Sequence, residues 1–240
     1  MVWRPSLPPA LSGLLKPRRP EQALCCTALS RNPSLEGAVA ELAAELRRCG
    51  LPRGSDGAGA DLALVFCSTA YASDLQRLLP LLRQAVPARH WLGCACGGVV
   101  GTDPDGTPHE LESQPAISLT LISLPGCTLQ PFRLEPGRLP DLDGPSQQWI
   151  DWVGGDPLQS HSMLLLVDPG CPSINDLISG LDYAYPNTVK VGGIAGQHSA
   201  SHGSLLFDDQ VVEGAIGCLI AGPWRIDPVV AQGCRPIGPV

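Results

Sequence analysis

The stretch WLGCACGGVVGT, residues 91–102, is an apolar run of strand character that ends in glycines and carries two cysteines. Upstream, LALVFC at residues 62–67 is a continuous apolar run, which is typical of a strand buried on both faces. Between them, leucines at positions 75, 78, 79 and 82 lie on one face of a predicted helix. A strand, a helix and a strand in this order predict a right-handed parallel βαβ unit.

The second half of the chain repeats this order. SMLLLVDPGCPSIND, residues 162–176, predicts a buried strand and a loop, and TVKVGGIAG, residues 188–196, predicts a strand that runs into glycines. At an offset of 100 residues Leu64 aligns with Leu164, and after one deletion, at 99, Gly93 aligns with Gly192. We therefore predict an α/β fold of two similar βαβ-plus-strands halves, about 61–133 and 162–230, forming mixed sheets with crossover helices.

The remaining segments are assigned around these halves. TLQPFRL, residues 128–134, is predicted as the last strand of the first half, and residues 134–160 as a linker with a short helix near 147–153. Residues 22–240 are expected to form the folded domain. The proline-rich first 21 residues are expected to be a disordered leader, with an organellar transit segment as the alternative.

Composition narrows the class of protein. The net charge is −7 and the sixteen Lys and Arg form no long basic run, which argues against a nucleic-acid partner. The longest apolar runs are far below the roughly 18 residues that span a bilayer. The ten cysteines show no CxxC repeat and no zinc-site spacing, so we expect reduced thiols, no metal and a soluble cytoplasmic protein.

Glycines follow the second strand of each predicted unit, which we place at residues 90–92 in the first unit. They lie at the carboxyl ends of strands, where ligands bind in open α/β sheets, and their bare amides favour a carboxylate or phosphate. The alternative is that they form tight turns. No phosphate-binding fingerprint is present, so a nucleotide is not expected. The glycines of these two bends are Gly93, Gly97, Gly98, Gly192, Gly193 and Gly196.

Several side chains near these glycines are further site candidates. Cys94 and Cys96 would point to the same side of a strand, either as buried or pocket-lining side chains or as a reactive pair. Asp168 follows the strand of the second unit, where it either receives an ammonium group or starts a turn. His198 and His202 lie in a polar loop and are either solvated or within reach of a ligand or a haem iron.

The glycine bend, together with FCSTAYASDLQRLLPLL (66–82), VGGIAGQ (191–197) and QGCRPIGPV (232–240), resembles the FIST family of sensory domains. FIST domains occur in bacterial signalling proteins and, in eukaryotes, beside F-box modules. The resemblance implies an intracellular sensor of small molecules such as amino acids, and some relatives are similar to haem proteins that sense nitric oxide. Family members continue into a C-terminal FIST region, so we expect a truncated product or half of a split protein.

The sequence thus predicts a non-enzymatic sensory module of a signal-transduction protein, without a cofactor. Its glycine bends would hold a small anionic or zwitterionic metabolite, with Arg235 as a carboxylate partner. A signalling output protein or a C-terminal FIST region is the expected protein partner. The alternatives are a haem-based nitric oxide sensor and an enzyme with Cys94 or Cys96 as nucleophile.

Overall fold

The computed structural model describes residues 23–50, 57, 59–198 and 202–230. The predicted leader and Arg235 lie outside these described residues. The first half contains β1 (Leu24–Ser30), α1 (Leu35–Cys49), β2 (Ala60–Ser68), α2 (Leu75–Ala85), β3 (Ala88–Cys96), β4 (Gly98–Thr102), β5 (Pro108–Glu112) and β6 (Ile117–Ser123). The second contains β7 (Thr128–Leu134), α3 (Ser146–Val153), β8 (Ser160–Val167), α4 (Ile174–Ala184), β9 (Val189–Ile194), β10 (Leu205–Phe207), β11 (Gln210–Val212) and β12 (Ala215–Ala221).

Both predicted crossover units are present. Strands β2 and β3 are connected through α2 and pair in parallel. Likewise, β8 and β9 are connected through α4 and pair in parallel. An antiparallel strand lies on the other side of each unit, β6 beside β2 and β12 beside β8. The predicted α/β fold with two similar halves and mixed sheets is therefore confirmed.

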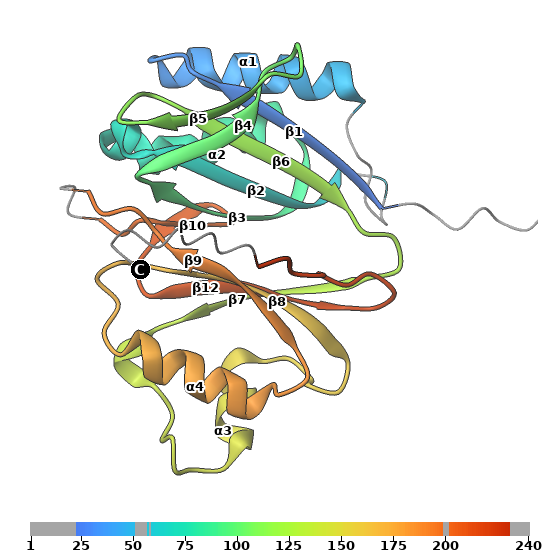
Figure 1. Cartoon of the computed structure of the whole chain (residues 1–240), viewed down its shortest axis with the longest axis vertical. Helices are drawn as coiled ribbons and strands as arrows, with labels where there is room; N and C mark the ends of the chain where they lie inside the picture. Colours follow the sequence, from blue (N-terminus) through green and yellow to red (C-terminus); the bar gives the residue numbers. More distant parts are fainter. Residues whose placement is uncertain (1–22, 51–56, 58, 199–201, 231–240) are drawn as a thin grey trace, which may run out of the picture.

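Apart from the two-stranded sheet of β4 and β5, the elements form four layers, two sheets face to face between two pairs of helices (Figure 1). The six-stranded sheet has the order β1-β6-β2-β3-β10-β11 and the four-stranded sheet the order β7-β12-β8-β9. Helices α1 and α2 pack on the outer face of the first sheet, and α3 and α4 on the outer face of the second. A third apolar cluster, which includes Leu62, Leu92, Ile216 and Cys218, fills much of the space between the sheets.

Strand β2 shows why the central strands are apolar throughout. Leu62, Leu64 and Phe66 face the opposite sheet, and the residues between them, Ala63 and Val65, face the helices. Successive side chains of a strand point to opposite faces, so a strand covered on both sides needs an unbroken apolar run.

The repeat is longer than the sequence predicted. Strand β7, which we assigned to the first half, pairs with β12 in the second sheet, as β1 pairs with β6 in the first. The halves are also interlocked, because β10 of the second half pairs with β3 of the first. Such pairings join residues far apart in sequence, and strand patterns alone do not specify them.

The predicted linker contains the predicted short helix, which is α3. Gly154 ends this helix in the left-handed conformation, with φ of 88°, and its N–H donates to the Ile150 carbonyl. Among the described residues, none of the helices combines the length and the apolar character that crossing a membrane requires.

Candidate functional site

Gly93 and Gly192 serve the packing of parallel strands. Strand β3 does not end at Leu92, as the glycines suggested, but continues to Cys96. Gly93 lies opposite Val65, and a Cβ there would be 1.9 Å from the Val65 carbonyl oxygen. In the second half Gly192 lies opposite Leu165, and its Cβ would be 1.6 Å from that carbonyl oxygen. The neighbouring backbone leaves no room for a side chain at either position, so the packing of the parallel strands explains both glycines.

The two glycine bends lie against each other. The N–H of Gly196 donates to the Ala95 carbonyl over 2.7 Å, and a Cβ on Gly196 would be 2.6 Å from the Gly97 nitrogen. The amide of Ala195 donates to Val167, and that of Ala95 to Ser204. These amides satisfy the protein's own carbonyls, so they are not a free row of donors for an anion. Gly97 and Gly98 are exposed beside this contact.

Close to the bends, the two sheets enclose a cavity of about 330 Å³, which we call the inter-sheet cavity. It unites four of the predicted site residues: Cys94 and Cys96 from β3, and Gly192 and Gly193 from β9. The other lining residues are Leu64, Phe66, Leu92, Leu164, Leu165, Leu166, Val191 and Ile194. Apart from the two thiols these side chains are apolar, and none carries a charge. The exposed residues of β9 open the cavity to solvent at one edge.

The two thiols lie next to each other on the wall formed by β3. Their sulfur atoms are 3.6 Å apart, Cys94 is 4% exposed, and Cys96 is half-buried. Donation from the Cys94 thiol lowers the pKa of Cys96 below the ordinary thiol value. The same contact, with burial, raises the pKa of Cys94 strongly. The pair therefore favours one thiolate on Cys96 and disfavours a second on Cys94.

This asymmetry predicts a pH dependence. A lowered pKa means more thiolate near neutral pH, so alkylation of Cys96 by iodoacetamide should reach half its maximal rate below the pH of an ordinary cysteine, about 8.5. In Cys94→Ala the pH of half-maximal alkylation should rise, because the hydrogen-bond donor to Cys96 is lost. Peptide mass mapping across a pH series measures the midpoint, and an unchanged midpoint in Cys94→Ala would contradict the pairing.

Asp168 lies elsewhere, at a pocket of about 590 Å³ beside Arg133, Glu135 and Glu213. Its carboxylate accepts hydrogen bonds from the N–H groups of Gly170, over 2.9 Å, and Ser204, over 2.8 Å. The side chain is 8% exposed. These bonds give Asp168 a structural role, to hold the β8–α4 turn against the segment that leads into β10.

Asp168→Ala should lower the free energy of unfolding by about 2–3 kcal/mol, because it leaves a buried and a partly buried N–H donor without an acceptor. Asp168→Asn retains one acceptor oxygen and should cost less. Urea denaturation of both variants measures the difference. Equal stability of the alanine variant and the unmodified chain would show that other groups satisfy these donors.

The loop histidines do not line the inter-sheet cavity. His198 Nε2 lies 3.2 Å from the Ser204 hydroxyl, His202 Nδ1 lies 3.1 Å from the Gly203 carbonyl oxygen, and the two rings are 5.4 Å apart. A haem iron needs an axial side chain aimed into its pocket, and neither histidine is aimed there. The described residues also hold no cluster of three or more His, Cys, Asp or Glu arranged for a metal ion. Neither histidine therefore supplies an axial ligand to a haem in the inter-sheet cavity.

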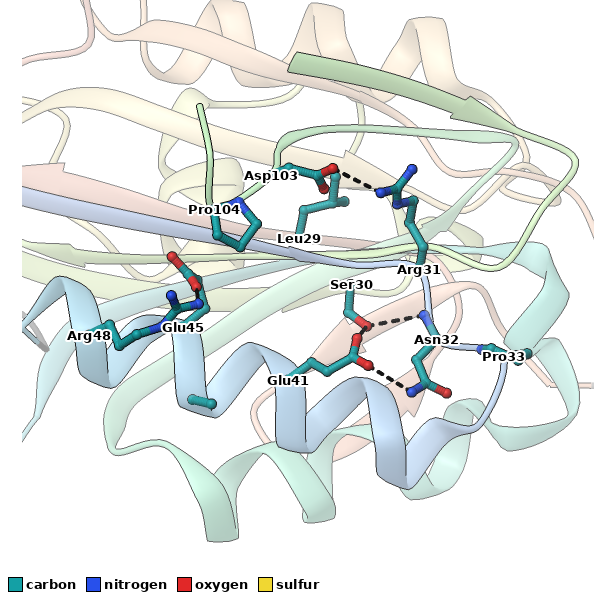
Figure 2. A pocket seen from close by; sticks show the side chains of 11 residues that line it. Leu29, Ser30, Arg31, Asn32, Pro33, Glu41, Glu45, Arg48, Asp103 and Pro104 are labelled. Atoms are coloured by element: carbon teal, nitrogen blue, oxygen red, sulfur yellow. Dashed lines mark hydrogen bonds and ion pairs between the residues drawn. The ribbon is translucent and has the colours of Figure 1, made fainter. Parts of the chain in front are cut away.

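Sequence reasoning did not identify a pocket of about 530 Å³ between the β1–α1 turn, α1 and the β4–β5 turn. Figure 2 shows that its polar groups meet one another. Glu41 accepts hydrogen bonds from the Ser30 hydroxyl, over 2.6 Å, and the Asn32 amide, over 2.8 Å, and Arg31 pairs with Asp103 over 2.8 Å. Because these groups are already satisfied, this pocket is a weaker ligand-site candidate than the inter-sheet cavity.

A model of the family described as the FIST N domain matches residues 61–240. The chain therefore belongs to the FIST family, as the motifs around the glycine bends indicated. An uncharacterized protein of Mycobacterium tuberculosis is 31% identical over 212 residues, 88% of this chain and 51% of that protein. Another, of Mycobacterium bovis, is 30% identical over 184 residues, 76% of this chain and 44% of that protein. The chain thus spans about half the length of the curated relatives it matches.

Among solved structures, cyanuric acid hydrolase from A. caulinodans matches with 11% sequence identity and a TM-score of 0.35. The match covers 84% of this chain and 68% of that chain. A likeness of this degree supports neither a shared fold nor a shared activity.

Proposed function

We propose that this chain is a non-enzymatic sensory module that binds a small molecule in the inter-sheet cavity. The FIST domain is a sensory domain of signalling proteins, and membership of that family makes ligand binding the natural role of a cavity. The observation that carries the proposal is the position of the cavity. Both halves of the repeat supply its walls, β2 and β3 on one side and β8 and β9 on the other.

The lining selects the chemistry of the ligand. Its walls carry no charged side chain, and in the nearby bends the amides of Ala95, Ala195 and Gly196 are already bonded within the protein. An anion wholly inside would lose its hydration without a partner, which is costly. A ligand with an apolar body suits the cavity, and any charged end would stay at the open edge along β9. Of the anionic and zwitterionic metabolites that the sequence interpretation allowed, we therefore favour an amino acid or similar metabolite that has an apolar side chain.

The alternatives have less support. For a cysteine nucleophile, the walls offer a second thiol but no His, Asp or Glu to act as general base.

We propose that binding is passed to a signalling output protein or to a C-terminal FIST region within an intracellular signalling protein. The length of the relatives is consistent with a further region beyond the matched part.

A thermal-shift panel tests the proposal. At a concentration about ten times its Kd, a ligand should stabilise the fold by about 1.4 kcal/mol, a rise in Tm of roughly 3–6 °C for a chain of this size. We expect such shifts with phenylalanine, leucine or isoleucine, and none with aspartate, lysine or ATP. Shifts confined to the charged compounds would contradict the assignment to the inter-sheet cavity.

A further inference from the structure

We infer that Cys94 and Cys96 form a dithiol site in the inter-sheet cavity for a neutral, trivalent soft atom that carries an apolar substituent, as in an organoarsenical. This inference goes beyond the proposed function, since it assigns a second class of ligand to the same cavity. It rests on the geometry of the two sulfurs and on the walls around them. The sulfurs belong to alternate residues of one strand, so both face the cavity.

The sulfur separation indicates how the pair would be bridged. A disulfide needs about 2.05 Å between sulfurs, so the observed 3.6 Å would have to shrink by roughly 1.5 Å within one rigid strand. A single bridging atom with bonds of about 2.3 Å, the length of a zinc–thiolate bond, fits the observed 3.6 Å at an S–X–S angle of about 100°. The pair is therefore placed for a one-atom bridge.

The same geometry distinguishes among the atoms that could bridge the two thiols. A linear two-coordinate Cu(I), with bonds of the same length, would need sulfurs about 4.6 Å apart. Zinc takes four ligands, and the walls of the cavity supply two thiols and no His, Asp or Glu. A pyramidal trivalent atom needs two sulfurs and one further group. The apolar walls supply a suitable environment for that third group.

The charge of the product also favours a trivalent bridging atom. The cavity has no cationic side chain to balance a monovalent metal such as Cu(I) bound by two thiolates, a complex that would be anionic. A trivalent arsenical forms a neutral product. In that reaction R–As=O and two thiols give R–As(SR)₂ and water: two S–H bonds break, two As–S bonds form, and the oxygen leaves with both protons. Arsenic stays trivalent, so no oxidant or reductant is needed.

Phenylarsine oxide is the probe, because its ring is apolar and it prefers closely spaced thiols. We expect intact-mass spectrometry of the full chain to show one high-affinity adduct equal to the arsenical minus water. In Cys94→Ala and in Cys96→Ala the apparent Kd should rise roughly 100-fold or more, since bidentate attachment is lost. Cys96 is half-buried, so Cys96→Ala keeps the test valid if Cys94→Ala is unstable.

Cys26 and Cys49 provide the matched control, because they form another thiol pair with a side-chain hydrogen bond. The Cys26→Ala/Cys49→Ala variant should keep the adduct at unchanged affinity. An adduct that survives in Cys94→Ala/Cys96→Ala, or that is lost in the control variant, would overturn the inference. So would equal affinity for 4-carboxyphenylarsine oxide, whose charge the apolar walls should reject by at least tenfold.

The mass measurement is independent of the thermal-shift panel. If amino acids stabilise the chain and no adduct forms at Cys94 and Cys96, the dithiol inference fails and the proposed function stands. If the adduct forms and no metabolite stabilises the chain, the dithiol site stands and the proposed metabolite sensor fails.

Discussion

Replacing Gly192 with alanine should lower the free energy of unfolding by about 3 kcal/mol, whereas alanine at the adjacent Gly193 should leave it almost unchanged. The new Cβ at position 192 would be 1.6 Å from the Leu165 carbonyl oxygen, so β8 and β9 would have to separate. Overpacking a rigid core costs about 1–3 kcal/mol, and a clash with backbone belongs at the upper end. At position 193 no atom lies within 4 Å of the Cβ site.

Urea denaturation of the two variants measures this contrast, and Gly93→Ala extends it to the first half. A Cβ at position 93 would be 1.9 Å from the Val65 carbonyl oxygen, so a loss similar to that of Gly192→Ala is expected. If Gly192→Ala and Gly193→Ala proved equally stable, the close approach of the parallel strands in each unit would be refuted.

These glycines show what the sequence pattern could and could not predict. The alignment of Gly93 with Gly192 identified equivalent positions, and the structure places both opposite a carbonyl of the neighbouring parallel strand. The pattern did not distinguish such a glycine from one in a turn. We ended the strand at Leu92, but β3 continues to Cys96, because β2 and β10 pair with it on both sides. Only the neighbouring strands give that information.

The crossover units were predictable because their signals are local. A buried strand such as β2 needs apolar residues on both faces, and a covering helix such as α2 needs leucines on one face. The placement of β7 and of the β10–β11 hairpin depends on pairing with β12 and with β3, far away in sequence. No local sequence pattern indicates which strands pair in this way.

The candidate site was predicted in part. Cys94, Cys96, Gly192 and Gly193 come together at the inter-sheet cavity, but Asp168 lies at another pocket. Gly196 uses its amide within the protein, and Arg235 lies outside the described residues. The apolar walls, such as Phe66 and Leu166, were missed because from sequence they look like any buried strand residue.

Gly193→Leu should abolish ligand binding while the fold is retained. Gly193 lines the cavity and has free space at its Cβ position, so a leucine side chain can enter without moving backbone. The cavity measures about 330 Å³, so a leucine side chain would take up a large share of it. Gly193→Ala adds only a methyl group at the same position and is the matched control.

The most direct test of the inter-sheet cavity is the thermal-shift response of three proteins, the unmodified chain, Gly193→Ala and Gly193→Leu, to phenylalanine, leucine and isoleucine. We predict that at least one of these amino acids raises the Tm of the first two proteins by roughly 3–6 °C at ten times its Kd and leaves that of Gly193→Leu unchanged. Equal responses in all three proteins would contradict the account, because the ligand would then bind outside the inter-sheet cavity.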